Sequence, residues 1–151
     1  MKTKQINLIG IICFIISLFA CSSSMEIIVE DSEHIFSKED ISMIEKLNTT
    51  QYKFVIRVSN NYSQDTDFIT MSNDYIFENN LKDKNPIIYY IGMKNRISSI
   101  QATNFVSEQI SQDDFDKAMS IMIKNFKNDL YVLGITESIK YLDSVNDDIE
   151  L

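Results

Sequence analysis

The sequence has few of the residues that most often carry catalysis or hold metals. Its 151 residues include two cysteines, one histidine, three glycines, one proline and no tryptophan. His34 has no partner near it in the sequence, so the chain supports neither a His-rich metal site nor a histidine-based triad in a monomer. We interpret it as surface or helix-entry packing. A phosphate-binding P-loop and a recognisable metal-binding motif are also missing.

The N-terminus lacks a hydrophobic run long enough to span a membrane. Lys2 and Lys4 precede an apolar stretch, residues 8–20, which is the order of a secretory signal peptide. A transmembrane helix needs about 20 apolar residues, and three serines, rather than a cluster of Lys or Arg, follow Cys21. We therefore predict that residues 1–20 are an export signal.

The end of this signal, Leu18-Phe19-Ala20-Cys21, resembles the lipobox of bacterial lipoproteins. The resemblance implies that the Cys21 thiol accepts a diacylglyceryl group and that the small Ala20 gives a signal peptidase access to the bond before it. Phe19 departs from the small or hydroxylic residue usual there. Two or three acyl chains anchor a protein stably, whereas one chain binds marginally. We predict a lipoprotein held to a cell-envelope membrane, outside the cytoplasm, by palmitate-type chains on Cys21.

Removal of residues 1–20 from the 151 would leave 131 residues, enough for one domain with a core but not for two. Lys2 and Lys4 leave with the signal, so 12 of the 14 basic residues remain against 22 acidic ones. Such a surface repels phosphate backbones and disfavours nucleic-acid binding. Loss of Cys13 and acylation of Cys21 would leave no thiol, which excludes a disulfide, a cysteine zinc site and thiol catalysis.

Hydrophobic periodicity predicts one α/β domain, residues 35–142, between a lipidated tether, residues 21–34, and an acidic tail, residues 143–151. The expected helices are 37–47, 68–81, 111–126 and 131–142, and the expected strands are 53–58, 87–91 and 97–102. This order of elements implies a small sandwich, with a central mixed sheet of three to four strands and helices on both faces.

Local signals support several of these elements. Ser37 with Asp40 three residues later is typical of a helix start. Ser111 followed by an acidic first turn predicts the start of the clearest helix in the chain. The continuous apolar run 87–91, bounded by Pro86 and Gly92, predicts a strand covered on both faces.

Several segments look like the opening helix, first strand, arginine-bearing central hairpin and closing helices of a known family: residues 35–37, 54–58, 87–97, 110–114 and 126–135. Together they resemble the TPM domain family, which comprises membrane-attached α/β domains outside the cytoplasm or in organelle lumens. The resemblance runs from Ile35 to Leu142 and implies the same fold. The family's glycine-rich stretch after the hairpin is replaced by residues 101–105, and its Trp-Gly-type joint by residues 78–81.

The family includes acid phosphatases, calcium-binding members, and proteins that repair photosystems or modulate membrane receptors, so the fold alone does not choose an activity. Calcium takes about six to eight oxygen ligands. The aspartates that could supply them are Asp31, Asp65, Asp67, Asp74, Asp113 and Asp114. No calcium-loop spacing selects them, so we favour a solvated acidic surface without a cofactor, with a calcium site as the alternative.

Arg96 is the arginine that has a counterpart in the family. If the domain is a phosphatase, the resemblance implies that Arg96 and acidic residues lie at the loop ends of the sheet; otherwise Arg96 caps or solvates a hairpin. We assign Met119 and Met122 to the core and Tyr89 and Tyr90 to strand packing, rather than to ligand contacts.

These observations favour a membrane-anchored, non-enzymatic module that binds a protein partner or helps envelope proteins assemble or survive. The missing catalytic constellation and the scarcity of glycine loops support this hypothesis. One alternative is a TPM-like acid phosphatase, acting with or without a divalent cation. Another is a surface-exposed lipoprotein that contacts a host.

Overall fold

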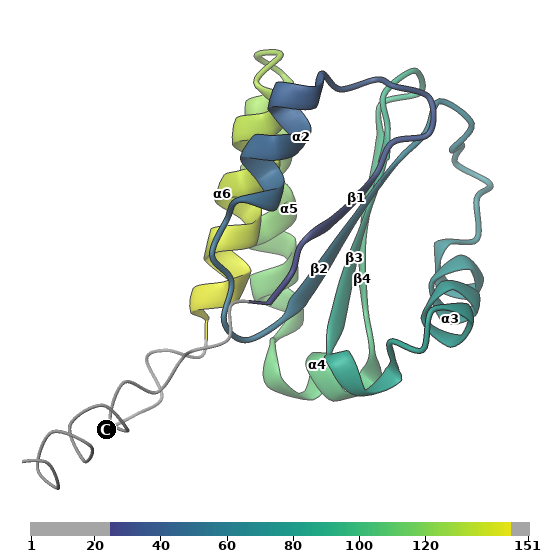
Figure 1. Ribbon diagram of the computed structural model, residues 1–151, viewed down its shortest axis with the longest axis vertical. Coiled ribbons are helices and arrows are strands. Elements are labelled where there is room, and N and C mark those ends of the chain that lie inside the picture. Colours follow the sequence, from purple (N-terminus) through teal and green to yellow (C-terminus); the bar gives the residue numbers. More distant parts are fainter. Residues whose placement is uncertain (1–24, 146–151) are drawn as a thin grey trace, which may run out of the picture.

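The computed structural model describes residues 25–145, which form a four-stranded sheet with helices on both faces (Figure 1). The strands are β1 (Ile28–Glu30), β2 (Lys53–Val58), β3 (Pro86–Gly92) and β4 (Ile97–Ala102). The helices are α2 (Lys38–Glu45), α3 (Phe68–Glu78), α4 (Asn104–Gln109), α5 (Gln112–Phe126) and α6 (Tyr131–Ser144), with a 3₁₀ turn, η1 (Lys82–Lys84). The predicted α/β fold class is confirmed.

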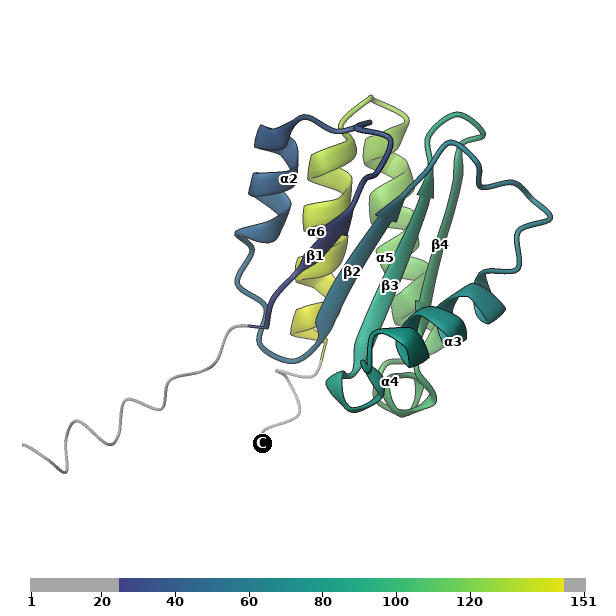
Figure 2. The ribbon, with the colours of Figure 1, turned by 45° about the vertical axis from the view of Figure 1, so that its right-hand side comes forward.

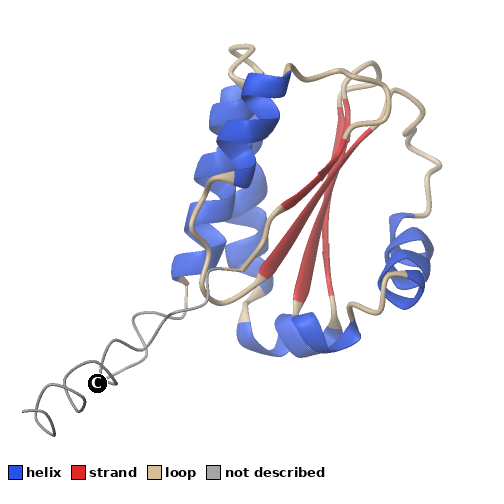
Figure 3. Ribbon diagram, in the orientation of Figure 1, coloured by secondary structure: helices blue, strands red, loops and turns tan. Residues whose placement is uncertain are grey.

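The helices form two layers, one on each face of the sheet. Helices α2, α5 and α6 cover one face of the sheet and α3 covers the other, as Figures 1 and 2 show from two directions. Figure 3 shows the sheet as the central layer, with α4 at the end where β4 stops. No helix among residues 25–145 is both long and apolar enough to cross a bilayer.

The sheet is mixed. Its order is β1-β2-β3-β4, in which the first three strands run parallel and β4 pairs antiparallel with β3. We call the end where β1, β2 and β3 begin the amino edge, and the end where they stop the carboxyl edge. All seven residues of β3 are buried, because strands flank it on both sides and helices cover both faces. This confirms the predicted doubly covered strand.

Alternating side chains of the strands divide the interior into two cores. Phe54, Ile56 and Tyr89 face the layer of α2, α5 and α6, and they pack there with buried helix residues such as Met122. The second core lies under α3 and contains Val55, Ile88, Tyr75, Tyr90, Tyr62 and Leu81. A sheet with apolar residues on both faces must be covered on both, which explains the position of α3.

Helix starts follow the predicted capping residues. The Ser37 side chain accepts from the Asp40 amide while the Asp40 side chain accepts from the Ser37 amide, a complete capping box. Ser111 caps α5 through the Asp114 amide. Helix α3 begins at a cap by Asp67 and ends at Glu78, before the predicted residue 81, because Asn80 takes a left-handed conformation with φ of 52°.

The described domain includes the ten residues before residue 35, so the prediction that residues 21–34 are a tether is wrong from Met25 onward. Met25 forms a bridge with Thr49, Ile27 is buried, and Ile28–Glu30 is strand β1, paired with β2. The strand is only three residues long, and its pairing depends on a partner far along the chain. The signal peptide, residues 1–20, and Cys21 lie outside the described residues.

Two further differences lie near the C-terminal half. Helix α4 was not among the predicted helices; Thr103 caps it and Val106 anchors it in the main core. The predicted acidic tail, residues 143–151, also begins later, because α6 continues to Ser144 and the Asp143 carboxylate accepts from the amides of Thr50 and Gln51 at 3.0 and 3.1 Å. Residues 146–151 lie outside the described part of the chain.

Candidate functional site

The carboxyl edge of the sheet carries a groove between the β3–β4 hairpin and the α5–α6 joint. Two adjoining hollows, of about 350 and 510 Å³, share Met93, Asp129 and Tyr131. In open α/β sheets, ligands bind beyond the carboxyl ends of the parallel strands, where loops from separate strands meet. We call these two hollows together the carboxyl-edge groove and take it as the candidate site.

The first hollow contains most of the polar groups of the groove. Arg96 from the hairpin and Lys127 from the end of α5 line it together with Asp129 and Tyr131. The Tyr131 hydroxyl donates to Asp129 Oδ1 at 3.0 Å, and this hydrogen bond raises the pKa of Tyr131. The Tyr131 ring packs edge-on against Phe126, with 5.0 Å between ring centroids. These two contacts favour one orientation of the tyrosine, which lines both hollows of the groove.

Backbone conformation sets the direction of two of these side chains. Arg96 has φ of 53° and Asp129 has φ of 58°, in the left-handed region that side chains other than glycine rarely adopt. Each residue ends a tight connection: Arg96 closes the loop between β3 and β4, and Asp129 lies between α5 and α6. Both turns therefore bring a charged side chain to the same hollow.

The second hollow is mostly apolar and lies between α2 and the start of α6. Its lining includes Met43, Leu130 and Leu133, which are 60%, 48% and 44% exposed. Ile35 and Phe36 form its inner wall, where Phe36 reaches the main core. Large apolar side chains that remain exposed beside a hollow are typical of surfaces that bind another molecule.

A second cluster of polar groups lies on the opposite face, beneath α3. Arg57 Nε donates to Glu30 Oε2 at 2.7 Å, and its guanidinium lies 4.5 Å from the Tyr75 ring centroid and 5.6 Å from that of Tyr90. The Tyr75 hydroxyl donates to Glu30 Oε1 at 2.7 Å, and burial raises the pKa of Tyr75. We assign this cluster a structural role, because its groups engage one another.

Sequence reasoning missed this cluster. Arg57 was treated only as part of a strand, and Glu30 as part of the tether. A charged residue within the apolar stretch 54–58 was the available signal, because alternation places Arg57 on the same face as Val55. The identity of its partner depended on finding β1.

The aspartates considered for calcium are distributed over separate elements and have local roles. Asp31 accepts from the amides of Ile35 and Phe36, Asp67 caps α3, and Asp114 accepts from Ser111 and Tyr141. The others, Asp65, Asp74 and Asp113, are exposed. Within residues 25–145, no three His, Cys, Asp or Glu side chains lie close enough together to hold a metal ion.

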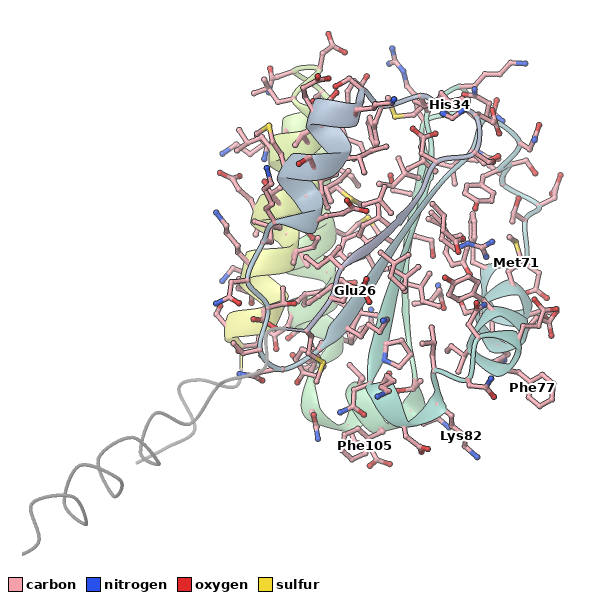
Figure 4. All side chains as sticks on the ribbon, in the orientation of Figure 1. Glu26, His34, Met71, Phe77, Lys82 and Phe105 are labelled. Carbon is pink, nitrogen blue, oxygen red and sulfur yellow. The ribbon has the colours of Figure 1, made fainter. Side chains whose placement is uncertain are left out.

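The other residues that the sequence singled out lie in the interior or at the surface. Tyr89, Tyr90 and Met122 are fully buried, which confirms that they pack in the interior. His34 is exposed in the loop before α2, near the carboxyl edge (Figure 4). Of the candidate site residues that lie within residues 25–145, only Arg96 lines the groove.

The groove can attract an anionic group and cover an apolar one. In the first hollow, Arg96 and Lys127 supply positive charge that Asp129 partly offsets, while the second hollow supplies apolar area and one further carboxylate, that of Asp40. Among its described residues, the Tyr131 hydroxyl is bonded to a carboxylate, because it donates to Asp129. The groove therefore combines polar groups and apolar area suited to binding a ligand.

Comparisons with known proteins establish the fold. The sequence matches no protein-family model and no curated protein. The NMR structure of BA42 from the psychrophilic bacterium Bizionia argentinensis is similar, with a TM-score of 0.63 and 12% identity over 75% of this chain and 82% of that one. The structure of the N-terminal domain of cg2496 from Corynebacterium glutamicum is also similar, with a TM-score of 0.58 and 12% identity over 80% of this chain and 78% of that one. At such low identity, the similarity is evidence for the fold alone.

Proposed function

We propose that this protein is a lipid-anchored lipoprotein outside the cytoplasm, whose TPM-like domain binds a protein partner in envelope assembly or maintenance. The observation that carries the proposal is the carboxyl-edge groove, with its exposed apolar rim and central tyrosine. Tyrosine, methionine and arginine are enriched at protein–protein interfaces, and Tyr131, Met93 and Arg96 all line this groove.

The shape of the groove supports a polypeptide ligand. Its two hollows adjoin along the start of α6, so a bound segment can place one side chain beside Tyr131 and another beside Leu133. Binding energy at such surfaces concentrates in a few aromatic and arginine side chains surrounded by residues that exclude water. Tyr131 and Arg96 would be the main contacts, and Leu130, Leu133 and Met43 would form the surround.

Site-directed photo-crosslinking in intact cells tests this function. A photoreactive amino acid at Leu133 is expected to join the protein to one discrete partner. The control is the same residue at Lys140, which lies two helical turns further along α6 and is also exposed. Leu130→Asp, which places a charge on the apolar rim, is expected to abolish the adduct. Equal adducts from both positions, or an adduct that survives Leu130→Asp, would count against the groove.

An acid phosphatase is the second candidate, because Arg96 and Lys127 bring two positive charges to one hollow and phosphoryl transfer needs such charges near the leaving oxygens. Phosphomonoester turnover should be measured with and without divalent cations, for the protein and for Arg96→Ala. Turnover that is lost in Arg96→Ala would support the phosphatase. Absence of turnover under all conditions would leave the binding function.

A further inference from the structure

We propose that the amino edge of the sheet rests on the lipid bilayer, with Phe77 and Phe105 inserted at the membrane surface. The inference rests on the lipid anchor at Cys21 that the proposed function includes. It adds an orientation: one end of the domain faces the lipid and the other faces away. Three observations carry it, namely where the domain begins, how little chain precedes it, and what the amino edge exposes.

The described chain begins at the amino edge and is held there. The Met25 amide donates to the Thr49 carbonyl at 2.7 Å, and the Thr49 hydroxyl donates to the Met25 carbonyl at 3.0 Å. Two residues later Ile27 is 3% exposed, and β1 follows. The N-terminal segment therefore joins the folded domain at Met25, beside the starts of β1 and β2 (Figure 1).

Very little chain separates this point from the expected lipid. Ser22, Ser23 and Ser24 are the residues between Cys21 and Met25. Four peptide steps span at most about 14 Å even when fully extended. An acylated Cys21 lies at the membrane surface, so the amino edge has to stay within that distance of the bilayer. A tether of residues 21–34 would have allowed the domain to move freely, but residues 25–34 are part of the described fold.

The amino edge exposes two phenylalanines. Phe77, near the end of α3, is 83% exposed, and Phe105, in α4, is 52% exposed. Both side chains point away from the domain at this end, with Lys82 between them (Figure 4). Phenylalanines on a polar surface are typical of segments that enter the boundary between headgroups and acyl chains. The two rings come from separate helices, α3 and α4, both of which contact β4, and this would give the edge two separate contacts.

Charges at this edge allow contact with a neutral bilayer. Lys82 and Lys84 lie in η1, where their long side chains can extend toward headgroups while the rings enter below them. Glu78, Asp83 and Glu108 lie close to the same rings in the sequence, so attraction to anionic lipid is not the source of the contact. The apolar rings and the anchor supply it.

This orientation would direct the carboxyl-edge groove into the aqueous space. The strands run from the amino edge to the carboxyl edge, so the groove lies at the end of the domain opposite Met25. A partner could then reach Tyr131 without displacing the domain from the membrane.

Single-tryptophan fluorescence tests the orientation. The chain has no tryptophan, so Phe77→Trp, Phe105→Trp and Leu130→Trp each introduce the only indole. The protein, residues 21–151, is coupled through Cys21 to a maleimide lipid in phosphatidylcholine vesicles; no other cysteine remains once residues 1–20 are absent. Chemical coupling fixes the anchor whether or not cells acylate Cys21. Mass spectrometry of the cellular protein tests acylation separately.

Lipids brominated near the top of the acyl chains quench the fluorescence of an indole that contacts them. On coupling to vesicles, the emission of Phe77→Trp and Phe105→Trp is expected to shift to the blue, and in brominated vesicles it is expected to be weaker than in unbrominated ones. Leu130→Trp, at a site 48% exposed on the opposite edge, is expected to do neither. Emission from Phe77→Trp and Phe105→Trp that matches Leu130→Trp would overturn the proposal, and so would quenching of only one of the two. All three sites are exposed, and circular dichroism checks that each variant keeps its fold.

Discussion

Asp31 is buried in the loop between β1 and α2, where its carboxylate accepts from two backbone amides. The bonds to Ile35 and Phe36 are 2.9 and 2.6 Å long. They organise the loop that carries His34 in a left-handed conformation, with φ of 55°. At the residue scale, the carboxylate of Asp31, which the sequence suggested as a possible calcium ligand, is therefore engaged in holding the backbone of this loop.

Asp31→Ala is expected to lower the free energy of unfolding by about 2–4 kcal/mol, because it leaves two inward-facing amides without an acceptor. Asp74→Ala provides the control, since Asp74 is exposed on α3, and is expected to change stability by less than about 0.5 kcal/mol. Urea denaturation measures both. Similar midpoints for the two variants would contradict the assignment.

Asp114 predicts a pH dependence. Hydrogen bonds from Ser111 and Tyr141 lower the pKa of Asp114, so the unfolded state binds its proton more tightly than the folded state. The stabilisation is present above about pH 4 and is lost as the pH falls through the lower folded value. The same contact raises the pKa of Tyr141 to about 12. Stabilisation from that group is lost as the pH rises from about 10 towards this value.

Tyr141→Phe removes the hydrogen bond between Tyr141 and Asp114, so this variant is expected to have a lower Tm than the wild type at neutral pH. The difference in Tm should narrow below about pH 4 and again above about pH 10. Melting curves across this range measure it. A difference that stays constant at every pH would show that the loss came from packing and not from the hydrogen bond.

At the scale of elements, the contact between α5 and α6 depends on Gly134. A methyl group at this position would lie 2.9 Å from the Met122 carbonyl oxygen and 3.0 Å from carbon atoms of Asn125 and Phe126. The nearest atom belongs to the backbone of α5, which cannot move aside easily. The glycine is therefore required for the two helices to approach, although glycine inside a helix is otherwise unfavourable.

Gly134→Ala is expected to destabilise the protein by about 1–3 kcal/mol, because the helices must separate to admit the methyl group. On an exposed helix, the same change would stabilise by up to about 1 kcal/mol. Lys140→Ala, at an exposed position of α6, serves as the control and should have little effect. An increase in Tm for Gly134→Ala would disprove the close contact.

Four elements show how far local signals extend. Ser37 and Ser111 marked their helices correctly, because a cap acts within three residues of itself. Helix α4 was missed, because its six residues are too few to show a helical repeat of apolar residues. Strand β1 was missed for the same reason: three residues carry no pattern of their own.

At the scale of the whole molecule, the acidic side chains of residues 25–145 do not gather anywhere in a group of three that could hold one metal ion. The carboxylates that engage protein groups do so on separate elements, as Asp31, Asp67 and Asp114 illustrate. Calcium would need several of them to converge. We therefore expect calcium to act on this domain only as an ion that screens surface charge.

Thermal melting with added calcium tests this expectation on residues 22–151. A ligand that binds only the folded state raises Tm in a saturable manner. We expect calcium and magnesium at equal ionic strength to give the same small change in Tm. A saturable rise with calcium alone would require a site that the described residues do not form, and would reopen a calcium-dependent function.

The amino-acid sequence by itself determined the features that depend on neighbouring residues. These include the caps of α2 and α5, the apolar run of β3, the excess of acidic side chains and the N-terminal pattern that predicts export and lipidation. The tertiary structure decided what depends on contacts between distant segments. Only pairing with β2 makes Ile28–Glu30 a strand, which shortens the tether, and only folding joins Met93 to Tyr131 in one groove. The physical reason is range: caps and periodicity act within a few residues, whereas a sheet or a groove forms between segments that the chain must first bring together.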